Sequence, residues 1–304
     1  MGLTRYPHGI SSFGIPVLGG GSLTTTGDIY FVQNTNGSNG NEGNDKDHPF
    51  ATLDYAIGKC TASQGDIIIL MPGHAETTTA IALDVAGISI VGLGVGRTRP
   101  TFTATTAATD LIDVTVANCK IENIRLVGAA SGCTSLISLV GAADFQAVGC
   151  SFEHGATPTS AISVGATSPR FSFIGCNFLG SANGPAVAID IVATGDDDFI
   201  IRDCIFNYGR YGLDTAGIRA NVDAADGGLI QNCQFIGMDT AAIDFNSSDT
   251  ANIAGLILDC SIGMGADTAN IDTAIDMSSY GCIRTYCTDL PAEGAGHIPV
   301  TTPA

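Results

Sequence analysis

Residues 171–178 read Phe-Ser-Phe-Ile-Gly-Cys-Asn-Phe, so that large apolar side chains alternate with small or polar ones around a glycine. Such alternation is typical of short β-strands that meet at a turn. The closing triplet, Cys176-Asn-Phe178, recurs along the chain as Cys-x-Phe or an apolar variant. Its nearly constant spacing indicates a repeat. The copies begin at Ile124, Cys150, Cys176, Cys204, Cys233 and Cys260, with a degenerate last copy at Cys287.

A second marker keeps the same period. It consists of a small or apolar residue, an isoleucine and a polar residue, as in Ala188-Ile189-Asp190. Its isoleucines are evenly spaced except for a longer last step, from Ile243 to Ile275. Two independent markers with one period and one phase predict a solenoid. The isoleucines are Ile112, Ile137, Ile162, Ile189, Ile218, Ile243 and Ile275.

A repeat of about 25–29 residues that holds two or three short strands matches one coil of a parallel β-helix. Successive coils then lie about 4.8 Å apart, so that equivalent residues stack on one another. Leucine-rich repeats have a similar length, but their Leu-rich strands and Asn signature are missing here. The sequence therefore predicts an all-β, single-domain, right-handed parallel β-helix.

The cysteines follow from this repeat. Alternation places each Cys of the Cys-x-Phe marker on the same face as the Phe two residues later, so the face is the core. We expect a stacked column of free, buried thiols, consistent with assembly in a reducing cytoplasm. Parallel side chains suit disulfides poorly, and one Cys per coil without a neighbouring His does not suit a metal site.

The chain divides into four segments. Residues 1–27 are rich in Gly, Ser and Thr, with scattered Tyr6, Phe13, Ile15 and Val17. Such a segment is either a disordered tail or an arm that becomes ordered on a partner, and we favour the arm. Residues 28–75 predict a capping segment that contains a helix within 48–60 and a buried strand after Gly65. Residues 76–290 predict the β-helix, and residues 291–304 a C-terminal tail.

The capping segment also carries a family resemblance. It reads Tyr30-Phe-Val, Asn36-Gly, Pro49-Phe-Ala-Thr-Leu-Asp-Tyr-Ala-Ile57, Gly65-Asp-Ile-Ile-Ile and Pro72-Gly73. This series resembles the N-terminal segment of pectate-lyase-like β-helix proteins. Its continuation, Gly73-His-Ala-Glu-Thr77, is similar to versions in virion proteins of tailed bacteriophages. The resemblance implies the fold and points to a phage origin, where such β-helices associate as homotrimers.

Composition excludes several classes of protein. With 45% hydrophobic and 14% charged residues the chain is too apolar for disorder, and no apolar run is long enough to span a membrane. The N-terminal residues lack the order of a signal peptide, so we expect the protein to stay in the cell that makes it. A net charge of −18 with scattered Lys and Arg argues against nucleic-acid binding.

Acidic residues are the main candidates for chemistry. Asp190, Asp244 and Asp276 follow the marker isoleucines and should point outward on one face, where paired carboxylates could hydrolyse glycosides. Arg219 and Ser138 share that column, so a solvated polar face is the commoner meaning. Residues 196–198, three aspartates in a row, predict a solvated turn more readily than a calcium site. Adjacent Arg202 and Asp203 should face opposite ways, so they form no lyase centre.

Other candidates are weaker still. The oxygen-rich loop 34–47 lacks EF-hand spacing and predicts a flexible surface loop. His74 and His154 have no ligand-spaced partner and are expected to be ordinary turn residues. Tyr208 and Tyr211 flank one turn and could form an exposed aromatic patch. The sequence thus predicts no catalytic, cofactor-binding or metal-binding residue.

Three functions are compatible with these features. The first is a structural virion protein, a capsid decoration (cement) protein on the virion surface that binds the major capsid protein through residues 1–27. The second is a receptor-binding tailspike or fibre that recognises host glycans, which should be longer and richer in aromatic residues. The third is a polysaccharide lyase or hydrolase, whose residues are missing. The first is favoured, with a homotrimer as the expected assembly.

Overall fold

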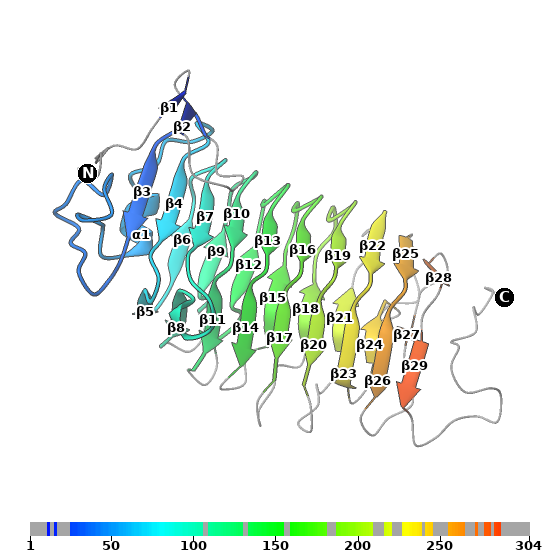
Figure 1. Cartoon of the computed structure of the whole chain (residues 1–304). Coiled ribbons are helices and arrows are strands. Elements are labelled where there is room, and N and C mark those ends of the chain that lie inside the picture. The colour runs from blue at the N-terminus through cyan, green and yellow to red at the C-terminus, as the bar shows by residue number, and fades with distance from the viewer. Residues whose placement is uncertain are drawn as a thin grey trace, which may run out of the picture.

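The computed structural model describes residues 25–105, 109–129, 133–154, 159–180, 187–208, 216–220, 227–238, 241–245 and 255–264. It also gives the backbone of 11–12, 15–16, 271–272, 277–280 and 283–286. These residues form a parallel β-helix in which short strands stack from the N-terminal to the C-terminal end (Figure 1). The all-β solenoid predicted from the two markers is therefore confirmed.

Three parallel sheets make up the solenoid, and the chain visits them in turn on each coil. Sheet 1 contains β3 (Ile29–Val32), β4 (Ile67–Leu70), β7 (Ser89–Gly92), β10 (Lys120–Glu122), β13 (Gln146–Val148), β16 (Ser172–Ile174), β19 (Ile200–Arg202), β22 (Gly228–Gln231), β25 (Gly255–Leu258) and β28 (Met277–Tyr280). Sheet 2 contains β5 (Ala75–Thr78), β8 (Thr101–Ala104), β11 (Arg125–Gly128), β14 (Ser151–His154), β17 (Asn177–Leu179), β20 (Ile205–Asn207), β23 (Gln234–Met238), β26 (Ser261–Met264) and β29 (Ile283–Tyr286). Sheet 3 contains β6 (Ile81–Leu83), β9 (Ile112–Val114), β12 (Ile137–Leu139), β15 (Ser160–Val164), β18 (Val187–Ile191), β21 (Ala216–Ala220), β24 (Ala241–Asp244) and β27 (Ile271–Asp272).

The turn from sheet 1 to sheet 2 explains the Cys-x-Phe marker. After each sheet 1 strand from β10 to β25, only two residues precede the next sheet 2 strand: one with a positive φ of 50° to 62° and then the marker residue. Gly, Asn and Asp tolerate this left-handed conformation best, and they occupy all of these positions. The turn aims the following Cys into the core. The left-handed residues are Asn123, Gly149, Gly175, Asp203, Asn232 and Asp259.

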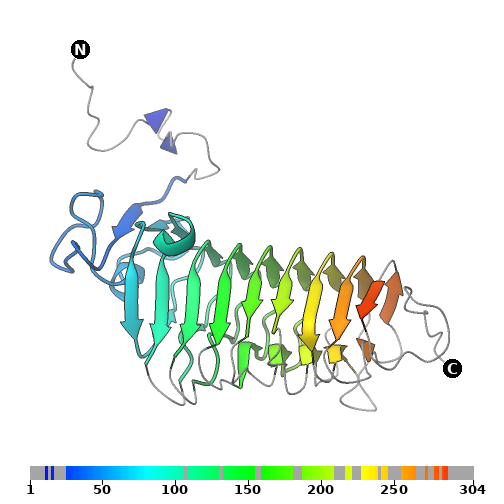
Figure 2. The ribbon, with the colours of Figure 1, turned by 60° about the horizontal axis from the view of Figure 1, so that its bottom comes forward.

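A stack of phenylalanine rings runs through the core beneath sheet 2 (Figure 2 shows these coils from another side). Phe152, Phe178, Phe206 and Phe235 are fully buried and pair in register on successive coils. Their ring centroids lie 4.7, 4.6 and 4.7 Å apart, with interplanar angles of 9°, 2° and 6°. The strand spacing of the sheet thus sets the stacking distance of the rings.

The isoleucine column is confirmed up to Ile243 but ends differently from our prediction. The register pairs Ile112, Ile137, Ile162, Ile189, Ile218 and Ile243 in series. It then pairs Ile243 with Ile271, so that Asp272 continues the column after Asp244. The predicted last member of the column, Ile275, was therefore wrong. The chain reads Ile-Asp-Thr-Ala-Ile-Asp from 271, which offers the same motif twice.

The cysteine column is confirmed from Cys150 to Cys260, and Cys287 lies outside the described residues. Cys150, Cys176, Cys204, Cys233 and Cys260 are buried and free. The first four place their Sγ within 3.4 to 3.7 Å of a carbonyl oxygen of an earlier sheet 1 strand, as Cys176 does with Ala147 at 3.4 Å. Burial also raises the pKa of the thiols outside the column, to about 11 for Cys133 and about 12 for Cys60.

We expect these thiols to be inert in the folded protein. The thiolate is the reactive form, and the apolar core disfavours this charged form and keeps alkylating reagents out. Brief alkylation of the native chain, followed by unfolding, a second label and peptide mass mapping, measures this directly. Cys150, Cys176 and Cys204 should carry only the second label. A first label on Cys176, or a disulfide to its neighbour, would contradict the free-thiol column.

The N-terminal segment contains a shorter helix than the one predicted within 48–60. Helix α1 spans Leu53–Ile57 and buries Leu53, Ala56 and Ile57 against the first coil. Phe50 is buried as expected and forms a parallel bridge with Val32, while Cys60 is half-buried. The capping role of this helix stays a prediction. A short 3-10 helix spans Gly96–Thr98.

The proposed arm lies largely outside the described residues. Within it the structure gives the backbone of β1 (Ser11–Ser12) and β2 (Ile15–Pro16), an antiparallel pair, and residues 25–27, where the backbone N–H of Gly27 donates to Thr25 Oγ1 at 2.9 Å. The predicted tail at 291–304 lies wholly outside the described residues.

Candidate functional site

The predicted acidic column lies on the outer side of sheet 3. The register sets Asp190 on β18 beside Arg219 on β21, and Arg219 beside Asp244 on β24. Arg219 donates from Nε to Asp190 Oδ1 at 3.0 Å and from Nη2 to Oδ2 at 2.6 Å. Asp190 is only 4% exposed, so this is a buried bidentate ion pair and not the solvated face that we expected. Asp276 lies outside the described residues.

This geometry limits the chemistry of the column. Both oxygens of Asp190 are engaged by the guanidinium, which neutralises the carboxylate in place. A general acid or base has to exchange its proton with a substrate, and a nucleophile needs a free oxygen. Asp190 therefore serves as a brace between two coils.

A smaller polar group continues the column toward the N-terminal end. Ser135 Oγ donates to Asp110 Oδ1 at 2.6 Å, and Asp113 stands beside Ser138 in the register. Partial burial, with the nearby negative charge of Asp110, raises the pKa of Asp113, while a hydrogen bond from Ser138 opposes the rise. Serines and aspartates of successive coils thus satisfy one another along this sheet.

The Asp196–Asp198 turn is not uniformly solvated, which corrects our expectation. Asp196 is fully buried, whereas Asp198 is exposed. Asp196 Oδ1 accepts the backbone N–H of Ser168 at 2.7 Å, and Ser168 Oγ accepts the backbone N–H of Ala142 at 3.1 Å. Side chains of successive coils thus satisfy backbone amides of the neighbouring coil. Asp196 Oδ2 has no hydrogen-bond partner, and burial raises the pKa of this carboxyl to about 7.

This pKa predicts a pH dependence of stability. An aspartate in the unfolded chain has a pKa of about 3.9, so between about pH 4 and about pH 7 only the folded state holds the proton. The stabilisation that protonated Asp196 gives the folded state is complete below the unfolded pKa of about 3.9. It is lost as pH rises toward the folded pKa, by up to about 1.4 kcal/mol per pH unit. Asp196→Asn stays neutral, so its stability relative to the unchanged protein should increase from about pH 4 to about pH 7 and then level off. Denaturant unfolding of both proteins across this range measures the difference, and parallel curves would contradict it.

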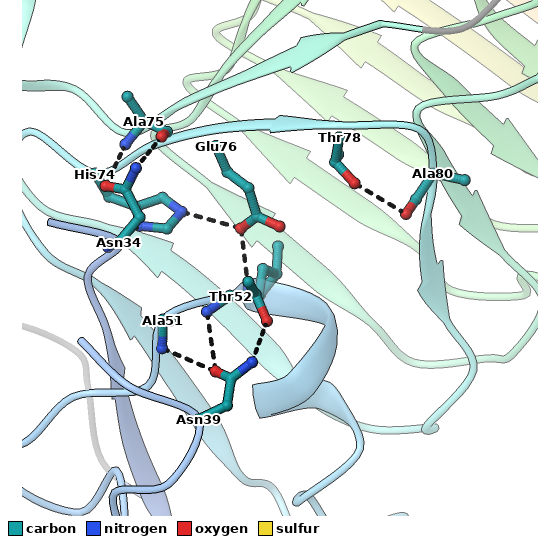
Figure 3. A network of polar contacts seen from close by, with 10 residues as sticks. Asn34, Asn39, Ala51, Thr52, His74, Ala75, Glu76, Thr78 and Ala80 are labelled. Carbon is teal, nitrogen blue, oxygen red and sulfur yellow. Dashed lines mark hydrogen bonds and ion pairs between the residues drawn. The ribbon is translucent and has the colours of Figure 1, made fainter.

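A buried network around His74 was missed in the sequence (Figure 3). His74 is fully buried, and its Nδ1 accepts the backbone N–H of Asn34 at 3.1 Å. The proton of a neutral ring therefore belongs on Nε2, which lies 3.3 Å from Glu76 Oε2 without hydrogen-bond alignment. The same Glu76 oxygen accepts the backbone N–H of Leu53 at 3.0 Å, at the start of α1.

This network joins three parts of the N-terminal segment. Asn34 exchanges side-chain hydrogen bonds with the backbone of Ala75, so the loop, α1 and β5 are held together (Figure 3). His74 is thus an anchoring residue and not an ordinary turn residue. The sequence did contain a sign of this contact: His74 and Glu76 are two residues apart, and residues i and i+2 of a strand share a face. The side chain of His154 lies outside the described residues.

Loop 34–47 uses its amides inside the chain. Asn39 Oδ1 accepts the backbone N–H groups of Ala51 and Thr52 at 2.9 and 3.3 Å, and Asn41 Nδ2 donates to the carbonyl of Pro49 at 2.8 Å. These bonds fasten the loop to the start of the helical turn. Across the described residues, no group of three or more His, Cys, Asp or Glu side chains is placed to hold a metal ion.

Two further predictions are settled by the structure. Tyr208 is buried, and burial raises the pKa of its phenol, so the exposed patch expected with Tyr211 was wrong for Tyr208. Tyr211 lies outside the described residues. Arg202 and Asp203 do not share a face of a strand: Arg202 is on β19, Asp203 is in the turn, and their charged atoms are 3.8 Å apart. Within the described part of the chain, no helix is long and apolar enough to cross a membrane.

Comparisons with known proteins find no matching family model and no matching curated protein. Among solved structures, the chain is similar to a rhamnogalacturonan lyase at 16% identity and a TM-score of 0.47, over 85% of this chain and 66% of that one. It is similar to a pectate lyase at 12% identity and a TM-score of 0.48, over 84% and 78% of the two chains. It is also similar to the ORF18 protein of Geobacillus virus E2, at 16% identity and a TM-score of 0.46, over 78% and 58%. The parallel β-helix that the resemblance implied is present in the strand order of the chain itself.

Proposed function

We propose that this chain is a structural virion protein of a tailed bacteriophage, a capsid decoration protein that binds the major capsid protein through residues 1–27. The observation that carries the proposal is the buried pair between Asp190 and Arg219. The acidic column of sheet 3 was the strongest candidate for catalysis in the sequence, and its residue Asp190 is instead held in an ion pair that joins two coils.

Similar pairs brace other coils. Arg170 binds Asp144 through two hydrogen bonds of 2.7 Å, and Arg125 binds both oxygens of Glu153. In each case the partners belong to successive coils. Together with the continuous ring and thiol columns, these pairs favour a stiff rod whose charged side chains serve the fold. A rigid rod suits a protein that reinforces or decorates a shell.

The charge of the chain fits this role. A net charge of −18 makes copies repel one another except where a specific contact exists, which limits non-specific clustering on a crowded surface. Phage origin is supported by the resemblance of residues 28–77 to virion proteins. We propose a homotrimer as the assembly, in line with that resemblance.

Binding to capsids that lack this protein tests the role of the arm. In the full chain, Tyr6, Phe13, Ile15 and Val17 are all replaced by serine, which removes the apolar side chains of the arm and leaves residues 28–304 unchanged. The unchanged chain should co-sediment with capsids, and the arm variant should lose binding by about tenfold or more. A matched variant, Ile298→Ser with Val300→Ser in the tail, should bind normally.

The outcomes separate the parts of the proposal. Equal binding by the arm variant would contradict the arm as the anchor. No binding by the unchanged chain, together with binding to host surface glycans, would replace the decoration role with a receptor-binding role.

A further inference from the structure

The outer side of sheet 1 changes character along the solenoid. On β10 it carries the exposed ion pair Lys120–Glu122, at 2.7 Å. From β16 to β25 the outward positions are mostly aliphatic, and we call this part of the surface the aliphatic face. Its apolar residues are Ile174, Ile200, Leu229, Leu256 and Leu258.

Three of these side chains stack into one aliphatic column, while in the adjoining column Arg202 and Gln231 stand between Ile174 and Leu258. The register pairs Ile200 with Leu229 and Leu229 with Leu256 on successive strands. Ile200 is 37% and Leu256 is 44% exposed, so the described residues leave both side chains partly open to solvent. A contiguous apolar patch of this kind marks an interaction surface more often than scattered single residues do.

The aliphatic face also lacks acidic residues, although the chain has 30 of them. Its remaining outward positions are Ser172, Arg202 and Gln231. Carboxylates lie in the flanking turns, at Asp198 and Asp203 at the two ends of β19 and at Asp259 after β25. Asp203 is held by Asn232 Nδ2 at 2.7 Å and lies 3.8 Å from Arg202. The strands of the face therefore carry one aliphatic column beside a mixed column, and the carboxylates lie in the flanking turns.

We infer that the aliphatic face is where a second copy of this chain packs side by side. Two molecules that each carry a charge of −18 repel over most of their surfaces, and the repulsion is weakest where both faces lack carboxylates. Flat sheet faces pack readily against each other, about 10 Å apart. A self-complementary face of this kind fits a second copy better than a basic partner, which would seek the acidic surface.

The size of the face sets the expected strength. Four strands spaced about 4.8 Å apart give a width of about 19 Å, so the face is smaller than the roughly 800 Å² per partner of a standard interface. We therefore expect the aliphatic face to form the centre of a larger contact between the two copies. Because its apolar area is small, we expect a dissociation constant in the micromolar range. Because net repulsion opposes the contact, added salt should strengthen it by screening, whereas a contact built on ion pairs would weaken.

Sedimentation velocity of the full chain, from about 1 to about 100 μM, tests the inference in the micromolar range. The variant Ile200→Glu with Leu256→Glu places like charges on both copies and should weaken association by about tenfold or more. The control, Asn207→Glu with Gln234→Glu, adds the same charge at exposed positions of sheet 2, outside the aliphatic face, and should associate like the unchanged chain. Melting curves establish that both variants are folded.

A second variant, Ile200→Ser with Leu256→Ser, removes aliphatic area without adding charge and should also weaken association. The inference is overturned if the unchanged chain stays monomeric over the whole range, or if the Glu variant associates as tightly as the control. It does not depend on the virion role, since capsid binding and self-association are measured separately.

Discussion

Replacing Phe206 with alanine is expected to lower the free energy of unfolding by about 3–5 kcal/mol. The ring is fully buried and stacks on Phe178 at 4.6 Å and on Phe235 at 4.7 Å. Its removal opens a cavity and interrupts the ring column in the middle of the solenoid, where each coil contacts only its two neighbours. Equilibrium unfolding in denaturant measures the loss as a shift of the midpoint.

The neighbouring residue provides a matched control. Asn207 lies on the same strand, β20, and is exposed on its outer side. Asn207→Ala should change the free energy of unfolding by no more than about 0.5 kcal/mol. Equal effects of the two substitutions would mean that the ring column does not hold the coils together.

Replacing Arg219 with methionine is expected to cost about 3–5 kcal/mol of stability at neutral pH. The Asp190 side chain is 6% exposed and that of Arg219 is 20% exposed, so the substitution leaves an uncompensated carboxylate in a buried place. Methionine fills much of the same volume, and the loss therefore reports the charge and not a cavity. Thermal and denaturant unfolding of the variant measure it.

Two further variants separate this interpretation from a general loss of packing. Asp190→Asn combined with Arg219→Met removes the stranded charge and should recover a large part of the loss. Arg170→Met breaks an exposed pair, whose side chains are 52% and 40% exposed, and should cost at most about 1 kcal/mol. If the double variant is as unstable as Arg219→Met alone, burial of the charge is not the cause.

The repeat was readable from the sequence because every coil imposes the same demands on it. From β10 onward, each described turn from sheet 1 to sheet 2 needs a left-handed residue followed by a buried apolar one, which yields Asn-Ile at 123, Gly-Cys at 149 and Asp-Cys at 203. Where a motif occurs twice within one coil, as at Ile271 and Ile275, the sequence does not decide the register. The unusually long step from Ile243 to Ile275 was the warning, since pairing with Ile271 restores the spacing of the other coils.

The contacts that cross from coil to coil were not readable. In the sequence, Asp196 has the features of a surface residue. In the structure it is buried, and its Oδ1 accepts a hydrogen bond from the backbone N–H of Ser168, one coil away. Tyr208 is buried because Gly180 on the previous coil leaves room for its ring, where a Cβ would lie 2.4 Å from the ring's Cδ1. Such pairs are about one repeat apart in sequence, and hydrophobic periodicity alone does not identify which polar residues meet.

The most direct test of the virion role is the amount and position of the protein in purified phage particles, by gel quantitation and cryo-electron microscopy. A decoration protein should be present on the order of hundreds of copies, in symmetric density on the outside of the capsid. Complete absence from the particles would contradict the proposed function, and a few copies confined to the tail would contradict the decoration role.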